Sequence, residues 1–147
     1  MVLKPEAILA RLKKLDRILE ELDQYRDLTW EEFVKSLSQR WIVERGLIAA
    51  AAMIFDVADN ILGGHFGQYA ESYEDSLEML RDLEVVPEDL YAQMKGLGGF
   101  RNILVHGYLE IDPRHVYENL DKGLRVFPRY GQVILAWLDA QERSNAH

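Results

Sequence analysis

The spacing of apolar residues constrains the fold of this chain more than any other feature. In its first part they recur at steps of three and four, as in Ile8, Leu12, Leu15, Leu19 and Leu22. Residues at this spacing lie along one side of a helix. The seam predicts a first helix over about residues 3–27. It is too short to establish a coiled coil, so we interpret it as a packing face inside a bundle.

The same helical spacing continues through the next part of the chain. Thr29 and Glu32 have the spacing of a capping box, in which each residue binds a free backbone amide of the other. A second, long helix is therefore predicted to begin at Thr29 and to run to Leu62. We expect Gly63 and Gly64 to end it, because glycine is favoured just past a helix.

Two further helices are indicated by their capping residues. Ser72 precedes "YEDSLEML", which predicts a short third helix capped by the serine hydroxyl. Pro87 stands before "EDLYAQM" and favours the first turn of a fourth helix. This fourth helix is predicted to continue to about His106.

The last helical segment begins at "DPRHVYENL". Asp112 is placed as an N-cap and Pro113 as the first helical residue, which is the position that proline tolerates best. Pro128 is expected to end or kink this fifth helix before a last segment through Leu138. The chain is thus predicted to be all-α, with about five to six helices.

Length and composition indicate one intracellular domain. The 147 residues suffice for a single core, so we expect one helical domain over residues 1–147. Cysteine is absent, which excludes disulfides and thiolate sites and favours a reducing compartment. The start, "MVLKPEAILARLKKL", is broken by charge and fits neither a signal peptide nor a membrane span. We therefore expect a soluble cytoplasmic protein without a membrane partner.

The charge argues against a general nucleic-acid binder, because the net charge is −8. Its distribution is uneven. Residues 95–130 hold six basic and four acidic side chains, which makes this segment +2 and the remainder −10. An anionic ligand is expected to bind this segment.

Four polar residues interrupt an otherwise apolar stretch, "GGFRNILVHGYLEID". They are Arg101, Asn102, His106 and Tyr108. Cleavage of RNA needs a group that titrates near neutrality and a cation that holds charge on the phosphoryl oxygens, while the 2′-hydroxyl supplies the nucleophile. His106 and Arg101 are candidates for these two roles.

The spacing of the pair raises a geometric difficulty. Five residues separate Arg101 from His106, which places them about 140° apart around an ideal helix. They can act at one point only if the helix ends near His106, as Gly107 favours, or if a second copy supplies one group. The alternative is structural, with Arg101 in an ion pair, Asn102 as a cap and His106 packed in the core.

Other chemistries find little support in the sequence. Gly96, Gly98 and Gly99 lack the Lys-Ser or Lys-Thr pair of a phosphate loop, so we interpret them as a place where another backbone or a ligand approaches closely, with helix packing favoured. No serine stands in a nucleophile elbow. The histidines are too far apart in sequence for a metal motif, so no metal ion is expected.

The motif "FRNILVHGYLEID" resembles the signature of HEPN-domain proteins, and most resembles the HepT-like toxins that pair with minimal nucleotidyltransferase antitoxins. Supporting segments are "AAAMIFDVADNILGGHF", "SYEDSLEMLRDLEVVPEDL" and "HVYENLDKGLRVFPRYGQVI", which extend the resemblance over about residues 33–136. It implies a mostly antiparallel helical bundle that forms a homodimer, with two motifs facing each other across the two-fold axis.

The resemblance also implies roles for individual residues. Arg101 and His106 would be the catalytic pair of a metal-independent ribonuclease that needs no cofactor, with tRNA or mRNA as substrate. Asn102 would position the substrate, and Tyr108 would accept AMP from the partner nucleotidyltransferase, which silences the toxin. Asp56 and Asn60 share a helix face and are candidates for orienting the motif or for packing between helices.

A second function stays open beside this one. The protein would then be a non-catalytic helical partner that presents a substrate, or Tyr108 itself, to a nucleotidyltransferase. The acidic composition supports this alternative, because the small local excess of positive charge offers little attraction for RNA.

Overall fold

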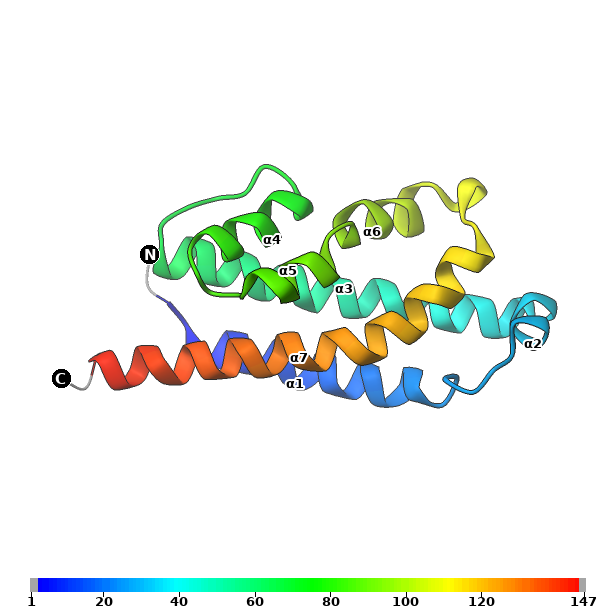
Figure 1. Ribbon diagram of the computed structural model, residues 1–147, viewed down its shortest axis with the longest axis horizontal. Coiled ribbons are helices and arrows are strands. Elements are labelled where there is room, and N and C mark those ends of the chain that lie inside the picture. Colours follow the sequence, from blue (N-terminus) through cyan, green and yellow to red (C-terminus); the bar gives the residue numbers. More distant parts are fainter. Residues whose placement is uncertain (1–2, 146–147) are drawn as a thin grey trace.

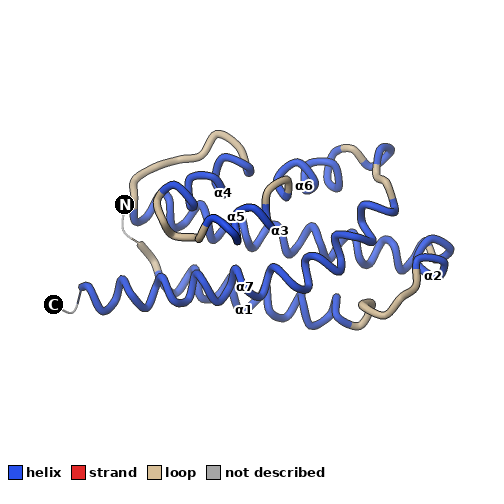
Figure 2. The backbone as a smooth tube through the Cα atoms, viewed as in Figure 1, coloured by secondary structure: helices blue, strands red, loops and turns tan. Residues whose placement is uncertain are grey.

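The described part of the chain, residues 3–145 of a computed structural model, is built from helices (Figures 1 and 2). These are α1 (Pro5–Asp23), α2 (Trp30–Lys35), α3 (Leu37–His65), α4 (Tyr73–Asp82), α5 (Glu88–Met94), α6 (Leu97–His106), the 3-10 helix η1 (Tyr108–Glu110) and α7 (Pro113–Asn145). The predicted all-α class is confirmed.

The long helices α1, α3 and α7 run side by side along the molecule, α4 and α6 pack against α3, and α5 lies against α4 and α7 (Figure 1). Helix α3 is central, since it packs against α1, α4, α6 and α7. The predicted seam of α1 is buried throughout. Deep in the core, the Tyr130 hydroxyl donates a hydrogen bond to the Ile54 carbonyl at 2.9 Å, which joins α7 to α3.

The apolar character of α3 follows from this central place. Among the described residues, α3 alone is long and apolar enough to cross a membrane, with a mean hydropathy of 1.5 over the relevant stretch. Of that stretch 56% is buried inside the protein, and the core helix of a globular protein meets the same criteria.

The capping residues expected from the sequence are present. Thr29 and Glu32 form the predicted capping box at α2. The Ser72 hydroxyl accepts a hydrogen bond from the Asp75 amide at 3.1 Å, and the Asp112 carboxylate accepts one from the Arg114 amide at 3.0 Å. Helices α4 and α7 therefore begin where the sequence predicted.

The second predicted helix, from Thr29 to Leu62, differs from the structure in two respects: it is broken near its start, and it ends later than predicted. Ser36 has extended backbone angles and divides it into α2 and α3, and its hydroxyl caps α3 by accepting from the Gln39 amide. Gly63 and Gly64 do not end α3, because both lie within its last turn. The stop comes at Gly67, whose φ of 64° lets the next amide bond back to the Leu62 carbonyl.

The later helices also correct two expectations. The helix predicted from Pro87 to His106 is divided into α5 and α6 at Gly96, whose φ of 96° suits glycine and is strained for other residues. Pro128 does not end α7, which runs unbroken to Asn145. Packing of the buried Leu124, Phe127 and Tyr130 around the proline offsets the hydrogen bond that it cannot donate.

Candidate functional site

The polar motif lies on α6, and its residues occupy different sides of that helix. Phe100 and Leu104 are buried against the core. Arg101 is half-buried, and its guanidinium carbon lies 4.6 Å from the centre of the Tyr73 ring on α4. Asn102 and His106 are exposed. The exposure of His106 excludes the alternative of a packed core histidine.

The start of α6 is fixed by a carboxylate from α4. Glu74 accepts hydrogen bonds from the Gly98 amide at 2.7 Å and from the Gly96 amide at 3.1 Å. A negative charge at this place also complements the positive end of the helix dipole. Glu74 therefore sets where α6, and with it the motif, begins. The sequence gives no sign of this contact, because it joins residues more than 20 positions apart.

The two glycines of the motif have different surroundings. A Cβ atom at Gly98 would lie 2.8 Å from the Glu74 backbone nitrogen, so the close approach of another backbone is confirmed there. A Cβ atom at Gly99 would meet nothing within 4 Å. Gly99 thus lies on an open face of α6, which it shares with Asn102, Ile103 and His106.

Helix α6 ends at His106, as the position of Gly107 predicted. The chain then forms η1, in which the Glu110 amide donates to the Gly107 carbonyl at 2.7 Å. Tyr108 is the first residue of η1. Its side chain lies outside the described part of the structure, so its predicted role as AMP acceptor stays a prediction.

Asp56 and Asn60 lie on α3. A carboxylate oxygen of Asp56 is 3.5 Å from the Nε of Arg11 on α1, and the Asn60 amide nitrogen donates to the Asp56 carbonyl at 2.7 Å. The neighbouring Phe55 packs on Tyr73, the residue that contacts Arg101, at 4.7 Å between ring centres. Within one chain the side chains of Asp56 and Asn60 thus contact α1 and their own helix.

A groove of about 350 Å³ lies where α3 meets the end of α6. Leu104 and Ile111 line it from the motif side, and Arg40, Glu44 and Arg45 line it from α3. Burial raises the pKa of Glu44, while neighbouring Arg40 acts in the opposite direction. Sequence reasoning missed these charges because they lie on the longest apolar helix, where the fold alone brings them beside the motif.

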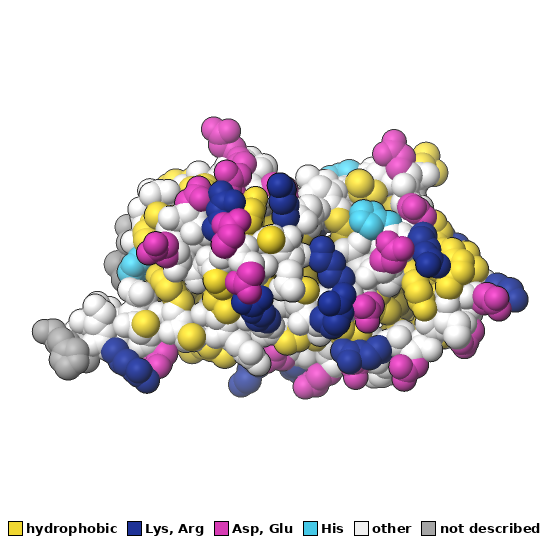
Figure 3. Space-filling model, in the orientation of Figure 1, with side chains coloured by type: hydrophobic (Ala, Val, Ile, Leu, Met, Phe, Trp, Pro, Cys, Tyr) yellow, Lys and Arg dark blue, Asp and Glu magenta, His cyan; other side chains and the backbone are white. Residues whose placement is uncertain are grey.

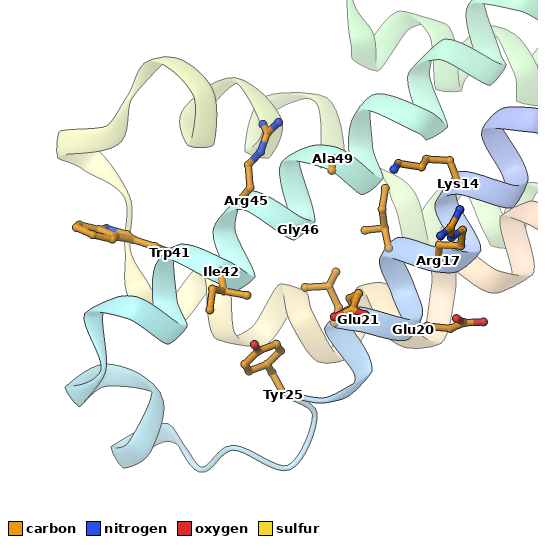
Figure 4. Close-up of a pocket in the computed structure, with 12 residues that line it drawn as sticks. Lys14, Arg17, Glu20, Glu21, Tyr25, Trp41, Ile42, Arg45, Gly46 and Ala49 are labelled. Atoms are coloured by element: carbon orange, nitrogen blue, oxygen red, sulfur yellow. The ribbon is translucent and has the colours of Figure 1, made fainter.

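A larger hollow, of about 680 Å³, lies between α1 and α3 (Figure 4). Lys14, Arg17, Glu20 and Glu21 line it from α1, and it contains none of the predicted site residues. In Figure 4 the Arg45 side chain leaves α3 on the side away from Glu20 and Glu21. Because both basic and acidic side chains line this hollow, it has no clear preference for an anionic ligand.

The described residues include no group of three or more His, Asp or Glu side chains placed to hold a metal ion. Helix α6 carries an exposed imidazole, a half-buried guanidinium and an exposed amide. This set can move a proton and hold a negative charge, which is the chemistry of phosphodiester transfer at a 2′-hydroxyl.

Known proteins share the sequence pattern and the fold of this chain. Residues 15–134 match the family described as Ribonuclease HepT-like. The tRNA nuclease HepT of Aphanizomenon flos-aquae is 28% identical over 144 residues, 97% of each chain. The cytosolic protein YutE of Bacillus subtilis, whose function is unknown, shares the fold, with a TM-score of 0.83 and 21% identity over 96% of this chain and 95% of its own.

A second solved structure has the same fold. It is a tri-AMPylated HEPN toxin of Shewanella oneidensis in complex with an MNT antitoxin, with a TM-score of 0.78 and 22% identity over 88% of this chain and 96% of its own. Fold and site together define a helical ribonuclease domain of the HEPN class. The chain belongs to the HepT-like ribonuclease family, since the family match spans most of its length.

Proposed function

We propose that this protein is the toxin of a toxin–antitoxin pair and cleaves tRNA or mRNA through Arg101 and His106. The observation that carries the proposal is the place of the motif, with an exposed histidine as the last residue of α6 and a guanidinium one and a half turns before it. The family of the chain and its nuclease relative support the same activity.

The reaction needs no group beyond the RNA and these side chains. His106 takes the proton of the 2′-hydroxyl or returns one to the leaving 5′-oxygen, while the 2′-oxygen attacks phosphorus and the bond to the 5′-oxygen breaks. Arg101 holds the charge on the phosphoryl oxygens, and exposed Asn102 positions the phosphate. The products are a 2′,3′-cyclic phosphate and a 5′-hydroxyl. We therefore propose metal-independent cleavage without a cofactor.

The site is completed by a second copy of the chain. Arg101 packs on Tyr73 of α4, while His106 is exposed to solvent. A catalytic cleft that contains both groups therefore needs the motifs of two chains. Two apolar side chains flank His106 and are exposed, Ile103 at 39% and Leu109 at 88%, and Gly99 adds an open helix face. Exposed apolar residues around an open face are typical of a contact surface. We propose a symmetric homodimer with this face of α6 near its axis.

Silencing is proposed to act on Tyr108, with a minimal nucleotidyltransferase as antitoxin. Tyr108 follows His106 by two residues, so AMP added there would bring a phosphate and a nucleotide close to His106. The adduct would pair with cations of the cleft and fill the space of the RNA. The AMPylated toxin of the same fold supports this proposal.

For Asp56 and Asn60 we propose the packing role, since Asp56 joins α3 to α1 through Arg11. Their contribution to substrate positioning would then be indirect. We place the protein in the cytoplasm, where its RNA substrates and its antitoxin occur.

Co-expression with a nucleotidyltransferase encoded beside this gene tests the proposal. Peptide mapping is expected to find AMP on Tyr108 and none in the Tyr108→Phe variant. Tyr130 is an internal control, because its hydroxyl is buried and bonded to Ile54. An unmodified protein that binds the nucleotidyltransferase but never cleaves RNA, alone or in complex, would favour a non-catalytic partner instead.

A further inference from the structure

Helix α7 carries a row of cations on its solvent side. Arg114, Lys122, Arg125 and Arg129 follow one another at spacings of eight, three and four, which keeps them on one side of the helix. The row is about 22 Å long at 1.5 Å per residue. The opposite side of α7 is buried, so these residues lie on the surface of the bundle.

Two adjoining grooves run beside this row. One, of about 500 Å³, lies between α7 and the turn after α1 at Arg26. The other, of about 330 Å³, lies between α7 and the junction of α5 and α6 at Lys95. They share Glu118 and Lys122 as lining residues and so form one surface, which we call the α7 groove.

The α7 groove is basic on an acidic protein. Its lining holds five Lys and Arg side chains, Arg26, Lys95, Arg114, Lys122 and Arg125, against the two carboxylates of Glu118 and Asp121. The whole chain carries −8. Lys and Arg side chains also gather over the middle of the face on which α7 runs in front (Figure 3). A net positive groove on such a chain favours an anionic ligand.

The cations of α7 and of the α7 groove differ in whether a carboxylate already pairs with them. Arg114 pairs with Glu118 at 3.3 Å and Arg125 with Asp121 at 3.1 Å, while Arg129 is held by Asp89 at 2.7 Å. None of the ion pairs among residues 3–145 includes Lys95 or Lys122. These two lysines are the cations of the α7 groove that are most available to a ligand.

The α7 groove reaches the helix that carries the motif. Phe100, the residue before Arg101, lines it, and its ring lies 4.8 Å from the ring of His115 on α7. From Phe100 to His106 is about 9 Å along α6. A ligand in the groove that is longer than one nucleotide is therefore long enough to reach the motif.

We propose that the α7 groove binds backbone phosphates of the RNA substrate next to the cleaved bond, with Lys95 and Lys122 as the main contacts. This inference rests on the proposed ribonuclease function. It explains how an acidic protein holds RNA, since affinity for nucleic acid comes mainly from contacts between phosphates and Lys or Arg. Lys95 and Lys122 are positioning residues here and take no part in the chemical step.

The test uses Lys95→Gln/Lys122→Gln in the full chain, with Lys13→Gln/Lys35→Gln as the control of equal charge on α1 and α2. RNA binding is measured on the His106→Ala background, so that no cleavage interferes. We expect the groove variant to lose roughly tenfold in affinity and its salt slope to fall by about 1.4, as two phosphate contacts on a single strand require. In the active protein the groove variant is expected to raise KM for long RNA more than it lowers kcat, since the lysines take no part in the chemical step.

Two results would overturn the inference. One is equal loss of RNA affinity in the groove and control variants, which would indicate general charge alone. The other is unchanged RNA affinity with loss of nucleotidyltransferase binding, which would make the groove a protein contact. Lysine-dependent binding by a wild-type protein that never cleaves RNA would support the groove and contradict the proposed activity. Melting curves confirm that the variants are folded.

Discussion

The two glycines at the start of the motif allow a sharp comparison, because only one of them has a neighbour in its own chain. In Gly98→Ala the new Cβ lies 2.8 Å from the Glu74 backbone nitrogen and 3.0 Å from the Tyr73 Cβ. Backbone cannot yield as a flexible side chain does, so α4 and α6 must separate. Overpacking of this kind costs about 1–3 kcal/mol. The helix preference of alanine over glycine offsets about 1 kcal/mol of it.

The expected net effect of Gly98→Ala is a loss of up to about 2 kcal/mol of unfolding free energy, or up to roughly 8 °C in Tm. Gly99→Ala meets no atom within 4 Å, so we expect a gain of about 0.5–1 kcal/mol in the folded chain. Chemical denaturation at one protein concentration measures both variants.

Gly99→Leu distinguishes an effect on folding from an effect on dimerisation. This change is expected to leave the helicity intact and to weaken the proposed dimer, which light scattering at micromolar concentration detects. The reasoning fails if Gly98→Ala is as stable as Gly99→Ala. It also fails if Gly99→Leu unfolds the chain as readily as Gly98→Ala without changing its mass in solution.

Three further changes test the fold around the site. Glu74→Ala removes the acceptor at the start of α6 and is expected to lower the unfolding free energy by about 1–2 kcal/mol, so an unchanged denaturation midpoint would contradict the cap. Tyr130→Phe deletes a buried hydrogen bond to α3 and should cost about 1 kcal/mol by the same assay, while a gain in Tm would show that the hydroxyl is dispensable. Partial burial and neighbouring Asp56 raise the pKa of Asp59 above its unfolded value, so its contribution to stability is lost as pH rises through the folded pKa. Asp59→Asn should therefore melt higher than wild type at pH 7 and equally near pH 3, and a lower Tm at pH 7 would refute this sign.

The elements that the sequence predicted well depend on local rules. The seam of α1 is buried as its spacing requires, and Thr29, Ser72 and Asp112 cap their helices through residues two or three positions away. Each of these signals is contained within a few turns of chain. Single-sequence reasoning therefore identified the fold class and most helix starts.

The elements that it missed depend on tertiary structure. Ser36 and Gly96 divide two long apolar runs, although nothing local separates a serine or glycine that breaks a helix from one that a helix tolerates. Gly63 and Gly64 stay helical because burial of the last turn of α3 outweighs their low helix preference, and Pro128 is retained in α7 in the same way.

The candidate site was predicted in part for the same reason. The end of α6 at His106 follows from the sequence around Gly107. The hydrogen bonds of Glu74 with the start of α6 and the ion pair of Asp56 with Arg11 do not, because each depends on which helices become neighbours. The lysines of the α7 groove lie 27 positions apart and are brought together only by the packing of α7 against the α5–α6 junction.

Cleavage of RNA by the purified protein in the presence of EDTA tests the central claim most directly. The wild type is expected to cut RNA and to leave 2′,3′-cyclic phosphate ends. His106→Ala and Arg101→Ala should each be slower by roughly 10²-fold or more, with helicity and melting nearly unchanged. Activity that EDTA abolishes, or that survives the loss of His106, would contradict the account.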